Sequence, residues 1–218
     1  MAAPITSSPI LIMVVDFGLG LRRPGCLPFL GEGIFVHDGL AWKHSREVLR
    51  RQFARVQANN LEIFEEFVED LVSSFAKSKG TVDLQPAFFR FTLGTTTALL
   101  FGESVTGLAE EEQTEFAQSF DHASEVTAMR LRLAEFCWLY TPKKFRKSCD
   151  VVKRTAEHFV QKALQHERDH GREGALKHYP FILELYEDLN DPIRVRDQLV
   201  NVLLAGRDTT ACTLSWTL

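Results

Sequence analysis

The alternation of apolar and polar positions along most of this chain has the period of an α-helix. After a turn at Asp38-Gly39, apolar residues lie at helical spacing from Trp42 through Val48 and Leu49 to Phe53, and again from Leu61 to Phe75. Residues with this spacing lie on one face of a helix and can be buried together. Similar patterns predict four further helices, at residues 86–101, 110–133, 150–170 and 180–189. The sequence therefore predicts a mainly α fold.

Several segments interrupt the helical pattern. Prolines at positions 4, 9, 24 and 28, together with several glycines, predict that residues 1–35 are irregular. Residues 81–84 are compatible with a short strand, and residues 171–174 are predicted to form a loop. Because no internal repeat occurs, we expect one domain over residues 1–218, irregular up to residue 35 and helical from residue 36 onward.

The last helix has the clearest start. Asp191 is a good N-cap residue, and Pro192 follows at the first helical position, where a missing N–H costs nothing. Leu and Val then dominate as far as the final residue, Leu218. Since no capping residue follows Ser215, apolar surface and carbonyl groups at this end would lack support. We therefore expect that the sequence stops inside a helix and that the chain is cut short.

Composition narrows the class of protein. The chain has 218 residues, 45% of them hydrophobic and 25% charged, which is typical of a globular domain. Its formal net charge of −4 argues against a nucleic-acid partner, because binding a duplex needs a concentrated excess of Lys and Arg. Reduced thiols in an intracellular protein are expected, because the four cysteines are far apart and form no C-x-x-C pair.

The apolar run near the start of the sequence is short. It extends from Ile10 to Val15 and is ended by Asp16. A helix that spans a bilayer needs about 20 apolar residues, and the apolar part of a secretory signal needs about 7–15. From the sequence alone we expect a chain that neither spans a membrane nor is secreted.

One short motif has the spacing of a zinc site. His166, Glu167 and His170 match H-E-x-x-H, in which two histidines on one helix face bind zinc and the glutamate acts as a base. Arg168 and Asp169, however, put charge where such helices carry apolar support, and no third ligand is evident. We predict a solvated, charged helix end and no metal site, with a zinc hydrolase as a minor alternative.

Other local motifs are less specific. The glycine pairs at positions 18 and 20 and at positions 31 and 33 lack the further glycine and the strand of a dinucleotide-binding turn. The basic cluster at residues 143–147 is compatible with a solvated face and with a patch for a partner. None of these motifs indicates a function by itself.

Two motifs carry more chemistry. Trp42 and Arg46 lie four apart on one helix face, so an indole N–H and a guanidinium can converge on one anion. In the last helix, Ala205 to Ala211 read A-G-R-D-T-T-A. A glycine there thins the helix wall for a flat ligand, and Thr209 can donate a hydrogen bond to the Ala205 carbonyl and loosen the helix locally. A polar stripe facing solvent or another helix is the alternative interpretation.

In this order the two motifs resemble those of cytochrome P450. W-x-x-x-R resembles the helix that binds a haem propionate, and A-G-x-D-T-T-A resembles the central helix on the distal side of the haem. The likeness extends to the fungal P450s that hydroxylate n-alkanes and fatty acids. The segments that carry this wider likeness are residues 31–46, 88–93, 100–105, 142–150 and 196–201.

The resemblance implies roles for matching positions. Trp42 and Arg46 would bind a haem propionate, and Ala205 and Gly206 would line the distal face of the haem. Asp208 and Thr209 would be the acid–alcohol pair that delivers protons during dioxygen activation. The family further implies an NADPH-cytochrome P450 reductase as partner, a long aliphatic, apolar small-molecule substrate, and a place on the endoplasmic reticulum membrane.

The resemblance covers only part of a P450. The expected fold is the part from the B–C region through the central distal helix, without the C-terminal part that holds the axial cysteine thiolate. None of the four cysteines (Cys26, Cys137, Cys149 and Cys212) has the glycine-rich context of that ligand. We therefore expect a monooxygenase by family that is inactive, and cytoplasmic, as this chain alone. A non-catalytic helical remnant or an interaction protein derived from a P450 is the alternative.

Overall fold

The computed structural model describes residues 18–57, 62–77 and 80–217. Within these ranges the secondary structure consists of helices, and no strand occurs, as the mainly α prediction requires. The elements are η1 (Gly20–Arg22), α2 (Arg23–Leu30), α3 (Gly39–Gln57), α4 (Glu62–Lys77), α5 (Leu84–Phe101), η2 (Val105–Gly107), α6 (Glu110–Leu133), η3 (Ala134–Leu139), α7 (Lys143–Leu176), α8 (Pro180–Leu189) and α9 (Pro192–Thr217). The apolar run at residues 10–15 lies outside the described ranges.

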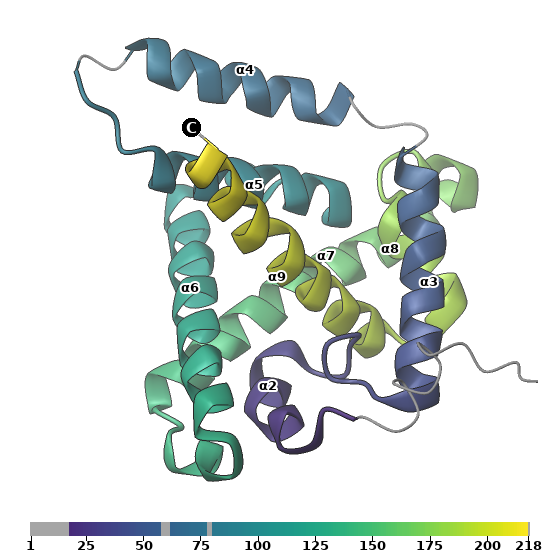
Figure 1. The fold of residues 1–218 in the computed structure, drawn as a ribbon. Coiled ribbons are helices and arrows are strands. Elements are labelled where there is room, and N and C mark those ends of the chain that lie inside the picture. Colours follow the sequence, from purple (N-terminus) through teal and green to yellow (C-terminus); the bar gives the residue numbers. More distant parts are fainter. Residues whose placement is uncertain (1–17, 58–61, 78–79, 218) are drawn as a thin grey trace, which may run out of the picture.

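Helix α9 runs through the middle of the molecule (Figure 1). It packs against α5, α7 and α8, while α6 crosses α7 and α4 lies along α5. Helix α3 stands on the opposite side from α6 and packs on α8. Because α5, α7 and α8 all pack on it, α9 is the element on which the others are assembled.

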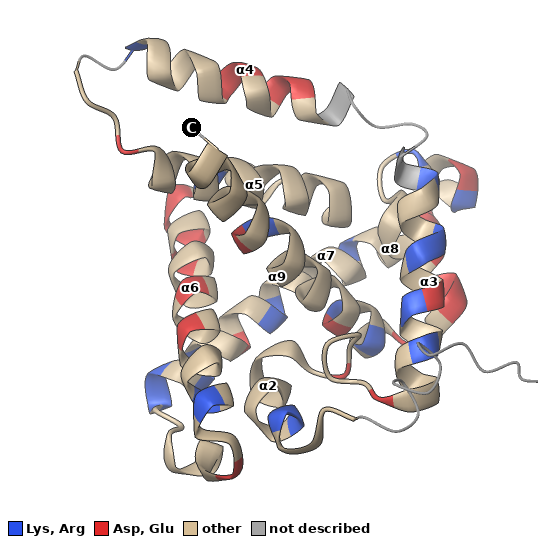
Figure 2. Cartoon of the chain, viewed as in Figure 1, with Lys and Arg blue, Asp and Glu red and all other residues tan. Residues whose placement is uncertain are grey.

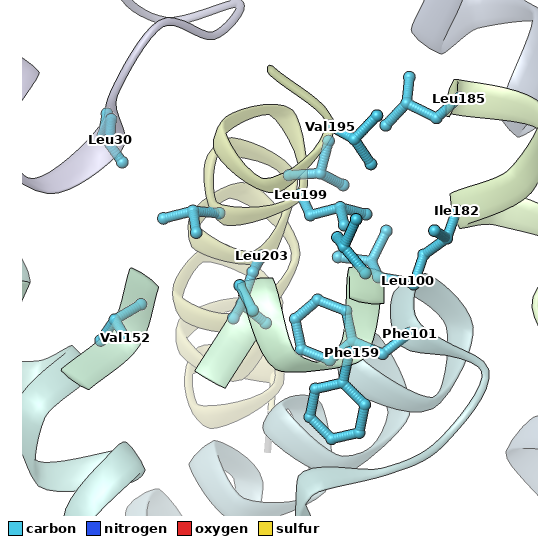
Figure 3. Close-up of a cluster of buried hydrophobic side chains, with 14 of the residues drawn as sticks. Leu30, Leu100, Phe101, Val152, Phe159, Ile182, Leu185, Val195, Leu199 and Leu203 are labelled. Carbon is cyan, nitrogen blue, oxygen red and sulfur yellow. The ribbon is translucent and has the colours of Figure 1, made fainter. Parts of the chain in front are cut away.

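The core surrounds the first half of α9 (Figure 3). Leu199 and Leu203 of α9 are fully buried among side chains of α5, α7 and α8. Next to them the rings of Phe101 and Phe159 stack, with centroids 4.8 Å apart and planes 11° from parallel. Large rings that bury their faces in this way supply much of a core's stability. None of the helices in the described ranges is long and apolar enough to cross a membrane.

Several helix boundaries agree with the sequence predictions. Helix α6 begins at Glu110 and ends at Leu133, and α8 covers residues 180–189. Asp191 caps α9 as expected, because its Oδ1 accepts hydrogen bonds from the N–H groups of Ile193 and Arg194.

The expectation of an irregular segment over residues 1–35 is wrong for residues 20–30, which form η1 and α2. A proline lies inside α2 at position 28, so the carbonyl of Pro24 loses its helical donor. Arg130 of α6 replaces that donor, since its Nη2 donates to the Pro24 carbonyl at 3.1 Å and its Nε donates to the Gly25 carbonyl at 3.2 Å. A distant arginine thus completes a helix that the local sequence disfavours.

Two further predictions are corrected. Residues 81–84 form no strand, because Asp83 accepts a hydrogen bond from the Gln85 N–H and caps α5. Helix α7 starts at Lys143 instead of Asp150 and continues past the predicted loop at residues 171–174. Gly171 takes φ 74° and ψ 165°, a backbone conformation open to glycine, so the chain kinks there and resumes helix.

A row of polar side chains on the buried face of α9 holds the loop between α2 and α3. Asp197 Oδ2 accepts from the Glu32 N–H at 2.8 Å, and Gln198 Oε1 accepts from the Ile34 N–H at 3.1 Å. Asn201 accepts from the Phe35 N–H at 2.9 Å and donates to the Leu30 carbonyl at 2.9 Å. These buried groups satisfy a loop backbone that makes few bonds of its own.

Two glycines allow the loop to approach α9 so closely. A Cβ at Gly31 would lie 2.2 Å from the Asp197 carboxyl, and a Cβ at Gly33 would lie 2.2 Å from the Asn201 amide nitrogen. Gly31 also has a φ of 63°, where other residues are strained. We call this set of contacts between α9 and residues 30–35 the loop clamp.

We predict that Asn201→Leu destabilises the protein by about 2–5 kcal/mol, because it leaves the buried Leu30 carbonyl and the part-buried Phe35 N–H without partners at about 1–3 kcal/mol each. The free energy of unfolding, measured in urea, checks this. Gln161→Leu on the exposed face of α7 is the matched control and should change it by less than about 0.5 kcal/mol. Equal effects of the two substitutions would contradict the role of the loop clamp.

Candidate functional site

An apolar groove of about 450 Å³ lies between α3, α9 and the clamped loop. Two of the residues predicted from separate motifs line it, Arg46 from α3 and Ala205 from α9. The other lining residues are Ile34, Phe35, Leu49, Arg50, Phe53, Ala54 and Val202. The fold therefore brings together two motifs that are about 160 residues apart in the sequence, on opposite walls of one groove.

On the α3 wall, the predicted pair lies on one helix face. The Arg46 guanidinium carbon is 5.4 Å from the centroid of the Trp42 ring, a cation–π contact. Trp42 is half-buried and Arg46 is exposed. The arginine therefore keeps its charge at the edge of an apolar groove, where an anionic group of a bound ligand would be attracted to it.

Polar contacts fix the start of α3 against α9. Ser45 is buried, and its Oγ accepts a hydrogen bond from Gln198 Nε2 at 2.7 Å. The same Oγ lies 2.8 Å from His37 Nδ1, in the loop that leads into α3. Since Gln198 also belongs to the loop clamp, the clamp and the α3 wall of the groove share one anchor.

On the α9 wall, Thr209 makes the predicted backbone contact. Its Oγ1 donates to the carbonyl oxygen of Ala205, which confirms the hydrogen bond expected from the sequence. The predicted loosening does not follow, since α9 is α-helical from Pro192 to Thr217. A threonine hydroxyl can thus bond the preceding turn without opening the helix.

Gly206 faces a different neighbour from the one that the sequence suggested. A Cβ at this position would lie 3.0 Å from Cγ2 and 3.1 Å from Oγ1 of Thr96 on α5. The missing side chain therefore lets α5 and α9 pack closely, and it does not thin the wall of the groove that Ala205 lines.

Asp208 is half-buried and has a charged partner next to it. Its Oδ1 accepts a hydrogen bond from Arg207 Nη1 at 3.0 Å. Burial raises the pKa of Asp208, the Arg207 guanidinium lowers it, and the Asp121 carboxylate on α6 raises it again, with a net increase above the usual value of 3.8. Asp208 therefore holds its proton to a higher pH than an exposed aspartate does.

The H-x-x-x-H pair forms no metal site in the described residues. The rings of His166 and His170 stack with centroids 4.2 Å apart, and His178 packs edge-on against His166 at 5.4 Å. Nowhere in residues 18–57, 62–77 and 80–217 do three His, Cys, Asp or Glu side chains form a group that could hold a metal ion.

The four cysteines are free thiols, three of them buried. Burial raises the pKa of Cys26 and raises the pKa of Cys149 to about 12, so both remain protonated at neutral pH. No cysteine is among the described residues that line the groove.

Two features of this region escape prediction from sequence pattern. The loop clamp depends on Asp197, Gln198 and Asn201, which look like ordinary polar positions in an amphipathic helix. Arg207 is also buried, at 3% exposure, although it lies within the motif that predicted the site. The available signal was that α9 continues apolar around these residues, so their polar groups need partners.

Comparison with known proteins gives one consistent family. Residues 24–218 match Cytochrome P450. Similar proteins are Cytochrome P450 52A5 of Candida maltosa, Cytochrome P450 52A1 of Candida tropicalis and Cytochrome P450 52A9 of Candida maltosa, which are 40%, 40% and 42% identical over 215, 216 and 218 residues. The alignments cover 92%, 92% and 93% of this chain and 40%, 39% and 41% of those proteins. The chain thus spans about two fifths of the length of the curated relatives it matches.

We predict that Asp208 makes the folded state less stable as the pH rises. A carboxyl with a raised folded-state pKa binds its proton more tightly when folded, so stability falls between pH 3.8 and the folded-state pKa and stays lower above it. Asp208→Asn removes this titration and should flatten the pH profile of urea unfolding over that window. Asp70→Asn, at an exposed position of α4, should leave the profile unchanged. A D208N profile equal to that of the wild type would refute the assignment.

Proposed function

Because this chain belongs to the cytochrome P450 family, we propose that the protein is a haem-dependent monooxygenase. It inserts one oxygen atom of O2 into a C–H bond of a long-chain aliphatic substrate, an n-alkane or a fatty acid. The observation that carries the proposal is the single groove that places Arg46 of the W-x-x-x-R motif opposite Ala205 of the A-G-R-D-T-T-A motif.

The lining of the groove is compatible with a bound haem. This lining is mainly apolar, as suits a flat macrocycle. Arg46 and Arg50 both line the groove, and we assign Arg46 to a propionate because it is the arginine of the W-x-x-x-R motif. Trp42 holds the Arg46 guanidinium in place through the cation–π contact. The small side chain of Ala205 leaves space on the α9 side of the groove. Gly206 contributes indirectly, by keeping α5 and α9 in close contact behind the α9 wall.

Bound haem supplies the iron at which dioxygen is activated. We propose that Thr209 and Asp208 of this chain hold and transfer protons near the bound haem. Thr209 donates its only hydroxyl proton to the Ala205 carbonyl, so its oxygen can accept a hydrogen bond from a water molecule or from a protonated group. Asp208, with its raised pKa, is a proton reservoir on the adjacent position of the helix.

The partner and location follow from the family resemblance. We propose that electrons come from an NADPH-cytochrome P450 reductase and that the whole protein works at the endoplasmic reticulum membrane. Apolar side chains around the groove, such as Phe35, Leu49 and Phe53, are compatible with an aliphatic substrate. The substrate class rests on the resemblance to alkane- and fatty-acid-hydroxylating P450s.

The direct test uses the longest form of the protein that the gene encodes. With haem present, its reduced carbon monoxide complex should show a Soret band at the position typical of thiolate ligation. With reductase and NADPH it should hydroxylate an n-alkane or a fatty acid. A transcript that stops after Leu218, together with a protein that takes up no haem, would instead identify a non-catalytic remnant.

We predict that Thr209→Val raises the fraction of consumed oxygen that is released as hydrogen peroxide several-fold, because the variant loses the hydroxyl that handles the proton. Thr213→Val is the matched control, since Thr213 Oγ1 donates in the same way to the Thr209 carbonyl at 2.8 Å, one turn farther along α9. For each variant, the free energy of unfolding should differ from that of the wild type by less than about 0.5 kcal/mol. Equal peroxide fractions for T209V, T213V and the wild type would exclude this role for Thr209.

A further inference from the structure

The motif on α9 contains a buried cation that the proposed function does not use. Arg207 has an exposure of 3%, and its guanidinium carbon lies 5.0 Å from the ring centroid of Phe89 on α5 and 5.1 Å from that of Phe120 on α6. In Figure 2, α9 carries charge at its N-terminal end and over one short stretch farther along, and is otherwise tan. Arg207 and Asp208 are that stretch.

One nitrogen of this guanidinium contacts two carboxylates. Nη1 lies 2.6 Å from Asp121 Oδ1 on α6 and 3.0 Å from Asp208 Oδ1 on α9. Nε is buried and has no hydrogen-bond partner among the described residues. The arginine is thus held by two rings and shared between two acids.

The position of Arg207 separates it from the groove. Ala205 lines the groove on the α3 side, whereas Arg207 contacts α5 and α6 on the other side of the helix. Asp208 is the next residue and bonds to Arg207 from the same turn. A movement of α6 that shifts Asp121 therefore changes how Nη1 is divided between the two acids, without any contact to the groove.

We infer that Arg207 is a positioning residue for Asp208, and that Asp121 on α6 determines how much of the guanidinium Asp208 receives. The inference rests on the proposed function only for the role of Asp208 in proton delivery. The positioning of Asp208 by Arg207 is argued from the contacts of Arg207 with Asp121, Asp208 and the two rings. Arg207 orients the Asp208 carboxyl from the α6 side of α9. Through Asp121, the packing of α6 is coupled to the proton reservoir on α9.

The first test needs no haem and uses urea unfolding of the longest encoded protein. Arg207→Met should lower the folding equilibrium constant at least about tenfold, because it leaves the half-buried Asp208 carboxylate without its cation. Arg168→Met, on the exposed face of α7, should change it less than about threefold. In the R207M background, Asp121→Asn should have no further effect. Additive losses would overturn the shared pair.

The second test measures the titration of Asp208 itself, as the difference between pH profiles of unfolding with Asp or Asn at position 208. The charged groups that act on this carboxyl are Arg207, which lowers its pKa, and Asp121, which raises it. The titration should therefore move to higher pH in R207M and to lower pH in D121N, and Arg207→Lys should return it toward the wild-type position. A purely structural Arg207 would leave the titration where it is, and that result would overturn the inference.

The third test measures whether Arg207 affects proton delivery in the active protein. R207M should raise the peroxide fraction several-fold with an unchanged substrate KM, Asp208→Asn should do the same, and the double variant should be no worse than either single one. An R207M protein with the wild-type peroxide fraction would overturn the coupling. If the wild type consumes no oxygen, the proposed function fails, while the two unfolding tests still decide whether Arg207 positions Asp208.

Discussion

The hydrogen bonds of the loop clamp are the interaction on which the site depends. They fix residues 30–35 to α9, and those residues lead directly into α3, so the clamp sets the distance between the two helices that form the groove. Gln198 extends the clamp to Ser45 inside α3. Because a buried amide or carbonyl without a partner costs more than its bond gains, these contacts hold together or fail together. The clamp therefore links the stability of the fold to the shape of the site.

The buried charged residues of α9 lie at two places, near its start and past its middle. Near its start, the buried Asp197 is balanced by Arg196, whose Nη2 lies 2.8 Å from Asp197 Oδ1, and the pair supports a loop. Farther along, Arg207 is shared by two carboxylates on different helices. Each buried charge is neutralised by a partner, as the low dielectric of the interior requires. The first pair supports a loop, and in the second Asp208 has a pKa raised above its usual value.

The sequence was sufficient for features that depend on local chemistry. The periodic patterns of α6 and α8 and the Asp191 cap give the observed boundaries, because the relevant partners lie within one turn or on one face. Prediction failed where the local structure depends on a residue that is distant in the sequence. Arg130 makes α2 possible despite its internal proline, and no pattern within residues 20–30 reveals that. In the same way Arg46 and Ala205 were predicted as candidates, but their position on one groove depends on long-range packing.

The hydrogen bond of Thr209 is in itself a weak indicator of function. Helix α5 contains three buried threonines, Thr92, Thr95 and Thr97, and each donates to the carbonyl four residues earlier. Such bonds let a helix carry a hydroxyl in an apolar setting at little cost. What distinguishes Thr209 is its location. Its side chain is exposed, and it donates to the carbonyl of Ala205, a residue that lines the groove together with Val202. It also directly follows Asp208, whose carboxyl is bonded to Arg207. The position of the hydroxyl relative to Ala205 and to Asp208, and not the bond that it makes, is therefore what supports the proposed role of Thr209 in proton transfer.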